Sequence, residues 1–76
     1  MTNQRHNQTI LVADDEPEIV DLVRLFLEWE GYTVVKASNG EHALAQARAI
    51  APDLILLDVR MPRLNGLDVL ERLQAD

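Results

Sequence analysis

The sequence predicts an α/β fold in which a doubly wound parallel sheet is built as βαβαβα with strand order 2-1-3. Two short, unbroken apolar runs, Thr9–Ala13 and Leu54–Leu57, are typical of strands buried on both faces of a parallel sheet. Segments with helical periodicity alternate with the strands, and strand–helix–strand crossovers are right-handed in nearly all proteins. With 76 residues, the chain has room for one small domain with a marginal core.

The first strand and helix are predicted between residues 9 and 31. Residues 1–8 are polar and are expected to form a disordered leader, so that the domain comprises residues 9–76. Pro17 suits the first turn of a helix, where no backbone N–H is needed, and Gly31 is typical of the position just past a helix end. A period of 3.6 residues predicts that one helix face packs on the sheet. The residues expected on this face are Ile19, Val20, Val23, Phe26 and Leu27.

A second apolar stripe lies beside the predicted core face of this helix. It consists of Leu22, Leu25 and Trp29. Two interpretations are open, namely core packing of a wide apolar face and docking of a partner protein. We favour core packing, because apolar stripes on helices are commonly wide.

The second strand and helix follow. Residues 32–37 have high strand propensity, and Ser38 with Glu41 three residues later matches a capping box. The box predicts a helix over residues 41–50 whose small apolar residues allow close packing on the sheet.

The third strand, at residues 54–57, leads through a loop to a final helix. This helix is predicted to begin at residue 65 or 66. Its leucines repeat at helical spacing, so we expect Leu67, Leu70 and Leu73 to face the core.

Aspartates follow the ends of two of the predicted strands. Asp14 and Asp15 come directly after the first apolar run, and Asp58 comes directly after the third strand. In strand order 2-1-3 these strands are neighbours, and the direction of winding switches between them. Ligands of open α/β sheets bind in the crevice at such a switch point. We therefore expect the three carboxylates to meet there, although each one alone would be taken for a common helix-capping residue.

Such a carboxylate cluster predicts a cation site. Like charges a few ångströms apart repel one another, and a bound divalent cation relieves the repulsion. An all-oxygen ligand set favours Mg²⁺, or Mn²⁺, over zinc. The glycines stand singly at positions 31, 40 and 66, so the sequence has no phosphate-binding glycine loop. Because no Ser-His-Asp or Cys-His set has a sensible placement, covalent chemistry would fall to a carboxylate.

Composition argues against other classes of partner. The net charge of −6 and the seven scattered Lys and Arg residues argue against binding of nucleic acid. No apolar run approaches the length of about 18 residues that a membrane span needs, and the polar start lacks the apolar stretch of a secretory signal. We therefore expect a cytoplasmic protein with no membrane partner.

Five sequence segments, taken in order, resemble the receiver domains of two-component response regulators, which have the flavodoxin-like fold. The segments are Ile10-Leu11-Val12-Ala13-Asp14-Asp15-Glu16, Gly31-Tyr32, Asn39-Gly40-Glu41-His42-Ala43-Leu44, Pro52-Asp53-Leu54-Ile55-Leu56-Leu57-Asp58, and Met61-Pro62 with Asn65-Gly66. Each segment is weak evidence alone, but together and at this spacing they are highly specific. The resemblance runs from residue 9 to the end of the chain.

The resemblance implies a function and a set of site residues. Asp58 corresponds to the aspartate that accepts a phosphoryl group from a sensor histidine kinase or a phosphotransfer domain. Asp15 and Asp58 would bind Mg²⁺ directly, together with the backbone carbonyl of Arg60, whereas Asp14 would act through a water. The chain would then be a signalling domain rather than an enzyme, with its own phosphorylation as its only chemistry.

The resemblance covers the N-terminal half of a receiver domain, because receivers run to about 120 residues. Their remaining strands supply a Ser or Thr and a Lys that contact the phosphoryl group, whereas the only lysine here, Lys36, belongs to the second strand. A fold truncated in this way implies impaired phosphorylation. It also leaves the third strand at a sheet edge, where unpaired backbone favours a homodimer or a swapped assembly.

Two other functions remain open. One is a receiver-derived interaction or assembly unit that carries out no chemistry. A more distant one is an aspartyl-phosphate hydrolase of the haloacid dehalogenase type, which also places an aspartate at a strand end. That family uses a second aspartate two residues later, where this chain has Arg60.

Overall fold

The computed structural model describes residues 8–58 and 64–75, so residues 1–7 of the predicted leader (residues 1–8) and the predicted ligand Arg60 lie outside the described residues. Strands and helices alternate along the described chain. They are β1 (Thr9–Ala13), α1 (Pro17–Trp29), β2 (Thr33–Ala37), α2 (Gly40–Ile50), β3 (Leu54–Leu57) and α3 (Gly66–Ala75). The strands are parallel, in the order β2-β1-β3, which confirms the predicted doubly wound α/β architecture.

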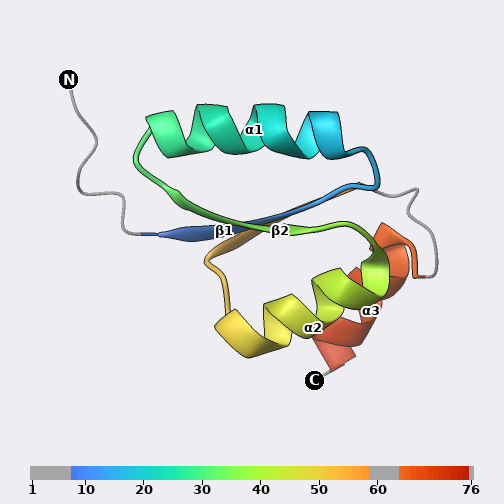
Figure 1. Ribbon diagram of the computed structural model, residues 1–76. Helices are drawn as coiled ribbons and strands as arrows, with labels where there is room; N and C mark the ends of the chain where they lie inside the picture. Colours follow the sequence, from blue (N-terminus) through green and yellow to red (C-terminus); the bar gives the residue numbers. More distant parts are fainter. Residues whose placement is uncertain (1–7, 59–63, 76) are drawn as a thin grey trace.

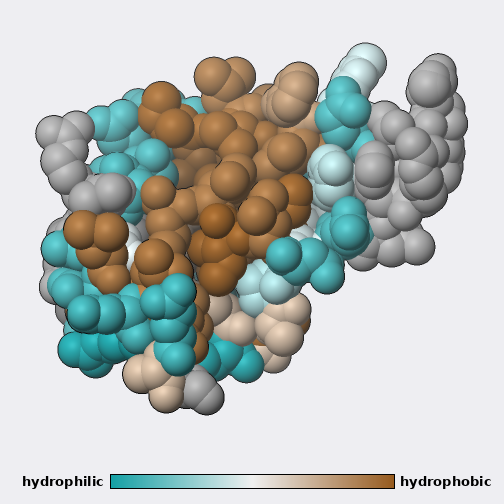
Figure 2. Space-filling view, turned by 180° about the vertical axis from the view of Figure 1, so that it is seen from behind, coloured by the Kyte–Doolittle hydropathy of each residue, from teal (hydrophilic) through white to brown (hydrophobic). Residues whose placement is uncertain are grey.

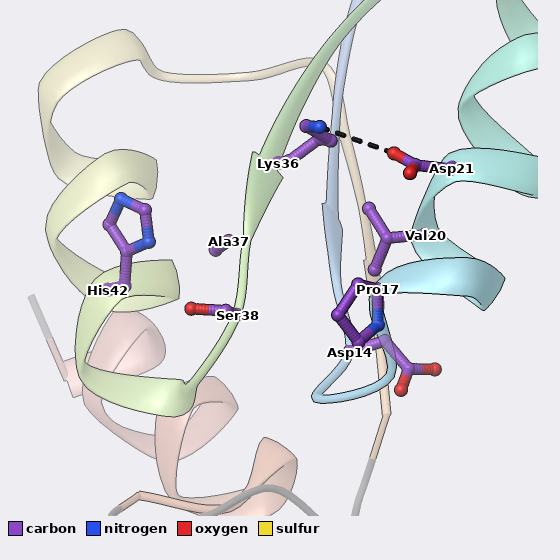
Figure 3. Close-up of a pocket in the computed structure, with 8 residues that line it drawn as sticks. All are labelled: Asp14, Pro17, Val20, Asp21, Lys36, Ala37, Ser38 and His42. Atoms are coloured by element: carbon purple, nitrogen blue, oxygen red, sulfur yellow. Dashed lines mark hydrogen bonds and ion pairs between the residues drawn. The ribbon is translucent and has the colours of Figure 1, made fainter.

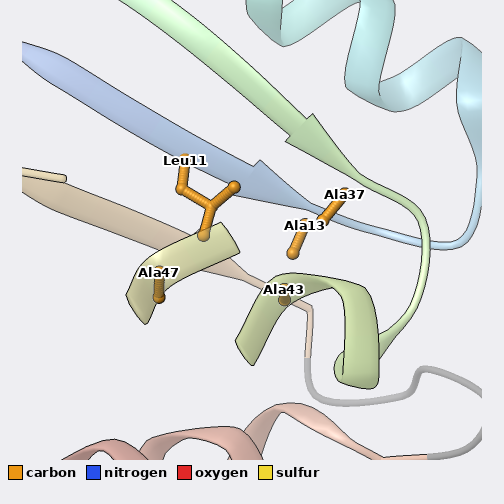
Figure 4. Packing of buried hydrophobic residues seen from close by; sticks show 5 residues of the cluster. All are labelled: Leu11, Ala13, Ala37, Ala43 and Ala47. Carbon is orange, nitrogen blue, oxygen red and sulfur yellow. The ribbon is translucent and has the colours of Figure 1, made fainter. Parts of the chain in front are cut away.

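The sheet is covered differently on its two faces (Figure 1). Helix α1 lies on one face, and α2 and α3 lie side by side on the other. Strand β1 is central, so alternate residues of β1 contribute to two separate cores. Ile10 and Val12 pack with Val20 of α1, whereas Leu11 and Ala13 pack with the small residues of α2. Figure 4 shows how closely Ala43 and Ala47 approach the sheet.

The start of α2 differs from the predicted capping box. The side chain of Asn39, rather than that of Ser38, caps the helix by accepting a hydrogen bond from the backbone N–H of His42 at 2.8 Å. The helix therefore begins at Gly40, one residue earlier than predicted. Gly40 is buried, and a Cβ at this position would collide with the backbone of Leu64. The close approach of the segment before α3 thus requires a glycine in the first turn of α2.

The inward faces of α1 and α3 are narrower than predicted. In α1, Val20 is buried and Val23 and Leu27 pack beside it, but Ile19 and Phe26 are exposed. In α3, Val69 is fully buried and Leu73 packs on the core, whereas Leu67 and Leu70 are exposed. Helix α3 packs against α2, so the inward line of this helix runs through Gly66, Val69 and Leu73.

The second apolar stripe of α1 is not part of the core. Leu22, Leu25 and Trp29 are 66%, 58% and 86% exposed, so the prediction of core packing was wrong. Strand β3 is likewise buried on one face only. Ile55 and Leu57 pack in the core beneath α2 and α3, whereas Leu54 and Leu56 are exposed on the face that carries α1. The expectation of a strand buried on both faces was therefore wrong for β3. None of the helices in the described residues is long and apolar enough to cross a membrane.

Candidate metal centre

The three aspartates converge where the carboxyl ends of β1 and β3 meet. Within the described residues, one carboxylate oxygen each of Asp14, Asp15 and Asp58 can be chosen so that all three lie within 4.8 Å of one another. Asp14 and Asp58 are partly buried, and Asp15 is exposed. The predicted convergence is therefore observed, whereas the role of these residues as ligands stays a prediction.

Backbone hydrogen bonds of the sheet hold two of these aspartates in place. The N–H of Asp58 donates to the carbonyl of Ala13 at 2.9 Å, which continues the pairing of β3 with β1. The N–H of Asp14 donates to the carbonyl of Ala37 at 3.2 Å, on the opposite side of β1. The two side chains are thus placed by neighbouring strands rather than by a long loop, so their separation is set by strand spacing.

One oxygen of Asp14 has a structural task that the sequence interpretation missed. Its Oδ1 accepts a hydrogen bond from the N–H of Glu16 at 3.0 Å, an Asx-type turn that leads into α1. The sequence signal for this turn was the position of Asp14 shortly before Pro17, the first residue of the helix. Because one oxygen is held by the backbone, Asp14 has less freedom than Asp15 to rotate toward a cation.

The geometry of the cluster suits a small, hard cation. Oxygens bound to one Mg²⁺ ion are about 3 to 4 Å apart, because each lies about 2.1 Å from the metal. Oxygens that lie within 4.8 Å of one another therefore need only small side-chain rotations, or one bridging water, to share an ion. The positive end of the α1 dipole, next to the cluster, offsets a small part of its negative charge.

The cations of α1 and β2 are paired elsewhere. Lys36 lies 3.3 Å from Asp21, and Arg24 lies 3.0 Å from Glu28. Figure 3 shows the ammonium of Lys36 directed toward Asp21, across a hollow that Asp14, Ser38 and His42 also line. Lys36 thus serves a surface ion pair between β2 and α1. The sequence predicted that Lys36 is unsuited to contact a group bound to Asp58. The observed position of Lys36, on β2, agrees with this prediction.

A groove opens beside the carboxylates on the other side of β1. It runs between α1 and β3, with Ile19 and Val23 on one wall and Leu56 on the other. Asp14 and Asp58 lie among the residues that line it. Two members of the cluster therefore face this groove, whose lining combines apolar side chains with the carboxylates of Asp14, Glu16 and Asp58.

Comparison with known proteins agrees with the resemblance to receiver domains found in the sequence. The sequence model of the family described as "Response regulator receiver domain" matches residues 10–76. The alkaline phosphatase synthesis transcriptional regulatory protein PhoP of Bacillus subtilis is 50% identical over 68 residues, which cover 90% of this chain and 28% of that protein. The probable transcriptional regulatory protein TcrX of Mycobacterium tuberculosis is 43% identical, with coverages of 90% and 29%. The chain thus spans less than a third of the length of these relatives.

Solved structures show the same fold. The N-terminal domain of a response regulator receiver protein from Methanoculleus marisnigri superimposes with a TM-score of 0.86 at 45% identity, covering 91% of this chain and 56% of that one. The response regulator protein TrrA of Thermotoga maritima, solved in complex with Mg²⁺ and BeF, gives a TM-score of 0.85 at 41% identity, with coverages of 90% and 59%.

Proposed function

This chain belongs to the response regulator receiver domain family of two-component signalling proteins, and we propose that Asp58 accepts a phosphoryl group from a sensor histidine kinase or a phosphotransfer domain. In this reaction the bond from phosphorus to the donor's histidine nitrogen breaks as a bond to a carboxylate oxygen of Asp58 forms. The observation that carries the proposal is the convergence of three carboxylates at the meeting point of β1 and β3. The chain acts as a signalling domain whose own phosphorylation is its chemistry.

The same three aspartates are proposed to hold Mg²⁺. Asp15 and Asp58 bind it directly with the backbone carbonyl of Arg60, and Asp14 acts through a water. The backbone hydrogen bond already made by Asp14 supports the indirect role. Bound Mg²⁺ supplies neutralisation of the phosphoryl oxygens during transfer. The Thermotoga maritima relative, solved with Mg²⁺ and BeF, supports magnesium, and the oxygen ligand set also suits Mn²⁺.

Phosphorylation of this 76-residue chain is expected to be weaker and shorter-lived than in a whole receiver domain. Lys36 is the only lysine, and its ammonium pairs with Asp21 on the far side of β1 from Asp58. A charge-assisted contact to a phosphoryl oxygen contributes about 2 kcal/mol, so a chain without one loses a comparable part of the phosphoryl group's stabilisation.

We also propose that the chain associates with itself through the exposed β3, as a homodimer or a swapped assembly. Leu54 and Leu56 are exposed there, and no strand covers the outer edge of β3 within the described residues. The chain itself is not proposed to bind nucleic acid, although relatives are named as transcriptional regulators. Because bacterial transcription takes place in the cytoplasm, that is the location we propose.

A receiver-derived assembly unit without chemistry is the second candidate function. Large apolar side chains on α1 and β3 favour it, because they are exposed beside the carboxylates. In this case Asp58 would stay unmodified and association alone would be the function.

Intact mass after incubation with acetyl phosphate and Mg²⁺ separates the two candidates. We expect the parent chain to gain one phosphoryl group and Asp58→Asn to gain none. Asp21→Asn is the matched control, because Asp21 is an exposed aspartate on α1 whose loss removes only surface ion pairs. No gain in a parent chain shown to be folded by circular dichroism would reject the phosphoacceptor function, and equal gain in Asp58→Asn would reject the assigned residue.

A further inference from the structure

Two Asn-Gly dipeptides occupy the same place in two neighbouring helices. Asn39-Gly40 stands at the start of α2, and Asn65-Gly66 stands at the start of α3. Asparagine followed by glycine is the dipeptide that most readily loses its side-chain amide in water, because glycine has no Cβ to hinder the ring closure. The other two asparagines of the chain lie within residues 1–7, and each of them precedes a glutamine.

The reaction of such a dipeptide replaces ammonia by water. The backbone nitrogen of the glycine loses its proton and attacks the side-chain carbonyl carbon of the asparagine. A new C–N bond closes a five-membered imide while the amide C–N bond breaks and ammonia leaves. Water then opens the imide at either carbonyl, which gives aspartate or isoaspartate. Water is the only co-reactant, so the reaction needs no enzyme and no cofactor.

Helix caps hold the reacting groups of both dipeptides. The Oδ1 of Asn39 accepts a hydrogen bond from the backbone N–H of His42 at 2.8 Å, and the Oδ1 of Asn65 accepts one from the N–H of Asp68 at 2.9 Å. Ring closure requires each side chain to leave its cap. The first turn of the helix must therefore open, and the rate of a slow reaction then follows the population of the opened form.

The first turn of α2 is held on two sides. Gly40 is buried against the backbone of Leu64, and Ala43 is fully buried in the core cluster with Leu11 and Ala13. Helix α2 packs on both β1 and β2 as well as on α3. Opening its first turn therefore breaks contacts with the sheet and with the segment before α3.

These contacts of α2 lie away from the apolar area of the molecule. Figure 2 shows this area, whose exposed residues include Leu54 and Leu56 of β3. In the flavodoxin-like strand order 2-1-3-4-5, further strands lie beyond β3. Asn39 instead follows β2, at the opposite edge of the sheet, so the contacts that hold its dipeptide do not depend on such strands.

Helix α3 depends on α2 for its support. It packs mainly against α2, through a side that includes Gly66, Val69 and Leu73. Opening α2 removes that support and frees the start of α3 too, whereas α3 can open while α2 stays on the sheet. The start of α3 is therefore open at least as often as the start of α2.

We propose that Asn65 is a site of spontaneous deamidation in this folded 76-residue chain, and that the fold protects Asn39 in the same dipeptide. Opening of α3 alone exposes Asn65 to the reaction. Asn39 reacts only when α2 also leaves the sheet. The proposal is independent of phosphorylation of Asp58.

The two products have different consequences for α3. Aspartate at position 65 still caps the helix, because a carboxylate oxygen can accept the hydrogen bond from the N–H of Asp68. Isoaspartate adds a CH₂ group to the main chain, which displaces the start of the helix and loosens α3. Either product adds a negative charge to a chain whose net charge is already −6.

Peptide mapping by mass spectrometry tests the proposal in the unmodified chain. Trypsin cleaves after Lys and Arg, so Asn39 lies in the peptide of residues 37–48 and Asn65 in the peptide of residues 64–72. Deamidation raises the mass of either peptide by one unit. The chain is incubated in mildly alkaline buffer with and without urea, and circular dichroism shows that the sample without urea is folded.

We expect three rates in a fixed order. In urea, the two asparagines should deamidate equally fast, because both precede glycine. In the folded chain, Asn65 should react more slowly than in urea, and Asn39 should react about tenfold more slowly again, because local openings of one fold differ widely in free energy. The asparagine at position 3, which precedes glutamine, is the control for the effect of glycine in urea.

A variant of α3 separates the two helices. Val69 is fully buried, so Val69→Ala leaves a cavity beneath the first turns of α3. Deamidation of Asn65 should become several times faster in this variant, and that of Asn39 should stay unchanged. Leu11→Ala is the contrasting variant, because Leu11 lies under α2 and its loss should accelerate both reactions. If either variant is unfolded, the parent chain decides the result.

Three results would contradict the proposal. The first is an Asn39 rate equal to or greater than the Asn65 rate in the folded parent. The second is no deamidation of Asn65 in the folded parent during the time in which it is converted in urea. The third is equal acceleration of both sites by Val69→Ala, which would show that α2 and α3 open as one unit.

Discussion

The two faces of the sheet are packed to different degrees. On the face under α2 and α3, small residues such as Ala43 and Ala47 bring the helix close to Leu11, and this cluster is almost fully buried. On the face under α1, Val20 is the only buried residue of the helix, and Phe26 and Trp29 are exposed. One sheet can thus have a well-buried core on one face and an exposed apolar surface on the other.

The largest expected difference between the faces concerns truncated leucines. Leu11→Ala should lower the free energy of unfolding by about 3 kcal/mol or more, because Leu11 is fully buried and a cavity remains. Leu54→Ala should cost about 1 kcal/mol or less in the dilute monomer, because Leu54 is 51% exposed. Urea denaturation at submicromolar protein concentration measures both. Equal losses would remove the distinction between the two faces.

The close packing under α2 and α3 depends on Gly40 as well. Gly40→Ala should lower the free energy of unfolding by about 1–3 kcal/mol, because the new Cβ would meet the backbone of Leu64, which cannot rotate away. Ala45→Gly, in the exposed middle of α2, is the control. It measures the effect of an alanine–glycine exchange on helix propensity alone, and we expect it to lower the free energy of unfolding by about 1 kcal/mol. A stabilised Gly40→Ala variant would show that α3 does not approach α2 as described.

The cap of α2 provides a sharper test of the same region. Asn39→Ala should cost about 1 kcal/mol, because the backbone N–H of His42 loses its acceptor. Ser38→Ala should change the stability little. Thermal or urea unfolding of both variants distinguishes the observed cap from the predicted capping box, and the reverse order of effects would restore the box.

A last expected effect lies at the ends of β1 and β3, where the stability difference between Asp15→Asn and the parent depends on the metal. In EDTA, Asp15→Asn should stabilise the chain by up to about 1 kcal/mol, because it removes repulsion within the carboxylate cluster. In Mg²⁺ at about ten times the dissociation constant, the parent should gain about 1.4 kcal/mol and the variant should gain less. Thermal unfolding in the two buffers gives both values, and equal stabilisation of the parent and of Asp15→Asn by Mg²⁺ would contradict binding of the cation by Asp15.

The sequence was sufficient to predict the topology and the meeting of the aspartates. Parallel strands place their carboxyl ends at one edge, so Asp14 and Asp58 converge whatever the details of packing. Burial of side chains could not be predicted as well. Leu54 and Leu56 have the same apolar pattern as a fully buried strand, because the pattern does not reveal whether a neighbour covers them.

The helices show the same limit. Helix α1 has apolar residues around most of its circumference, so periodicity alone did not distinguish Val20 from Phe26. Ser38 and Asn39 are both good capping residues one position apart, so the sequence alone did not distinguish between them.

Binding of Mg²⁺ by Asp15 and Asp58 together is the most direct test of the central claim, that the ends of β1 and β3 form one cation site. Isothermal titration of the whole chain with Mg²⁺ measures it. We predict one ion bound per chain, with binding lost in both Asp15→Asn and Asp58→Asn and retained in Asp21→Asn. Binding that persists in Asp58→Asn, or no binding by the folded parent chain, would contradict the account.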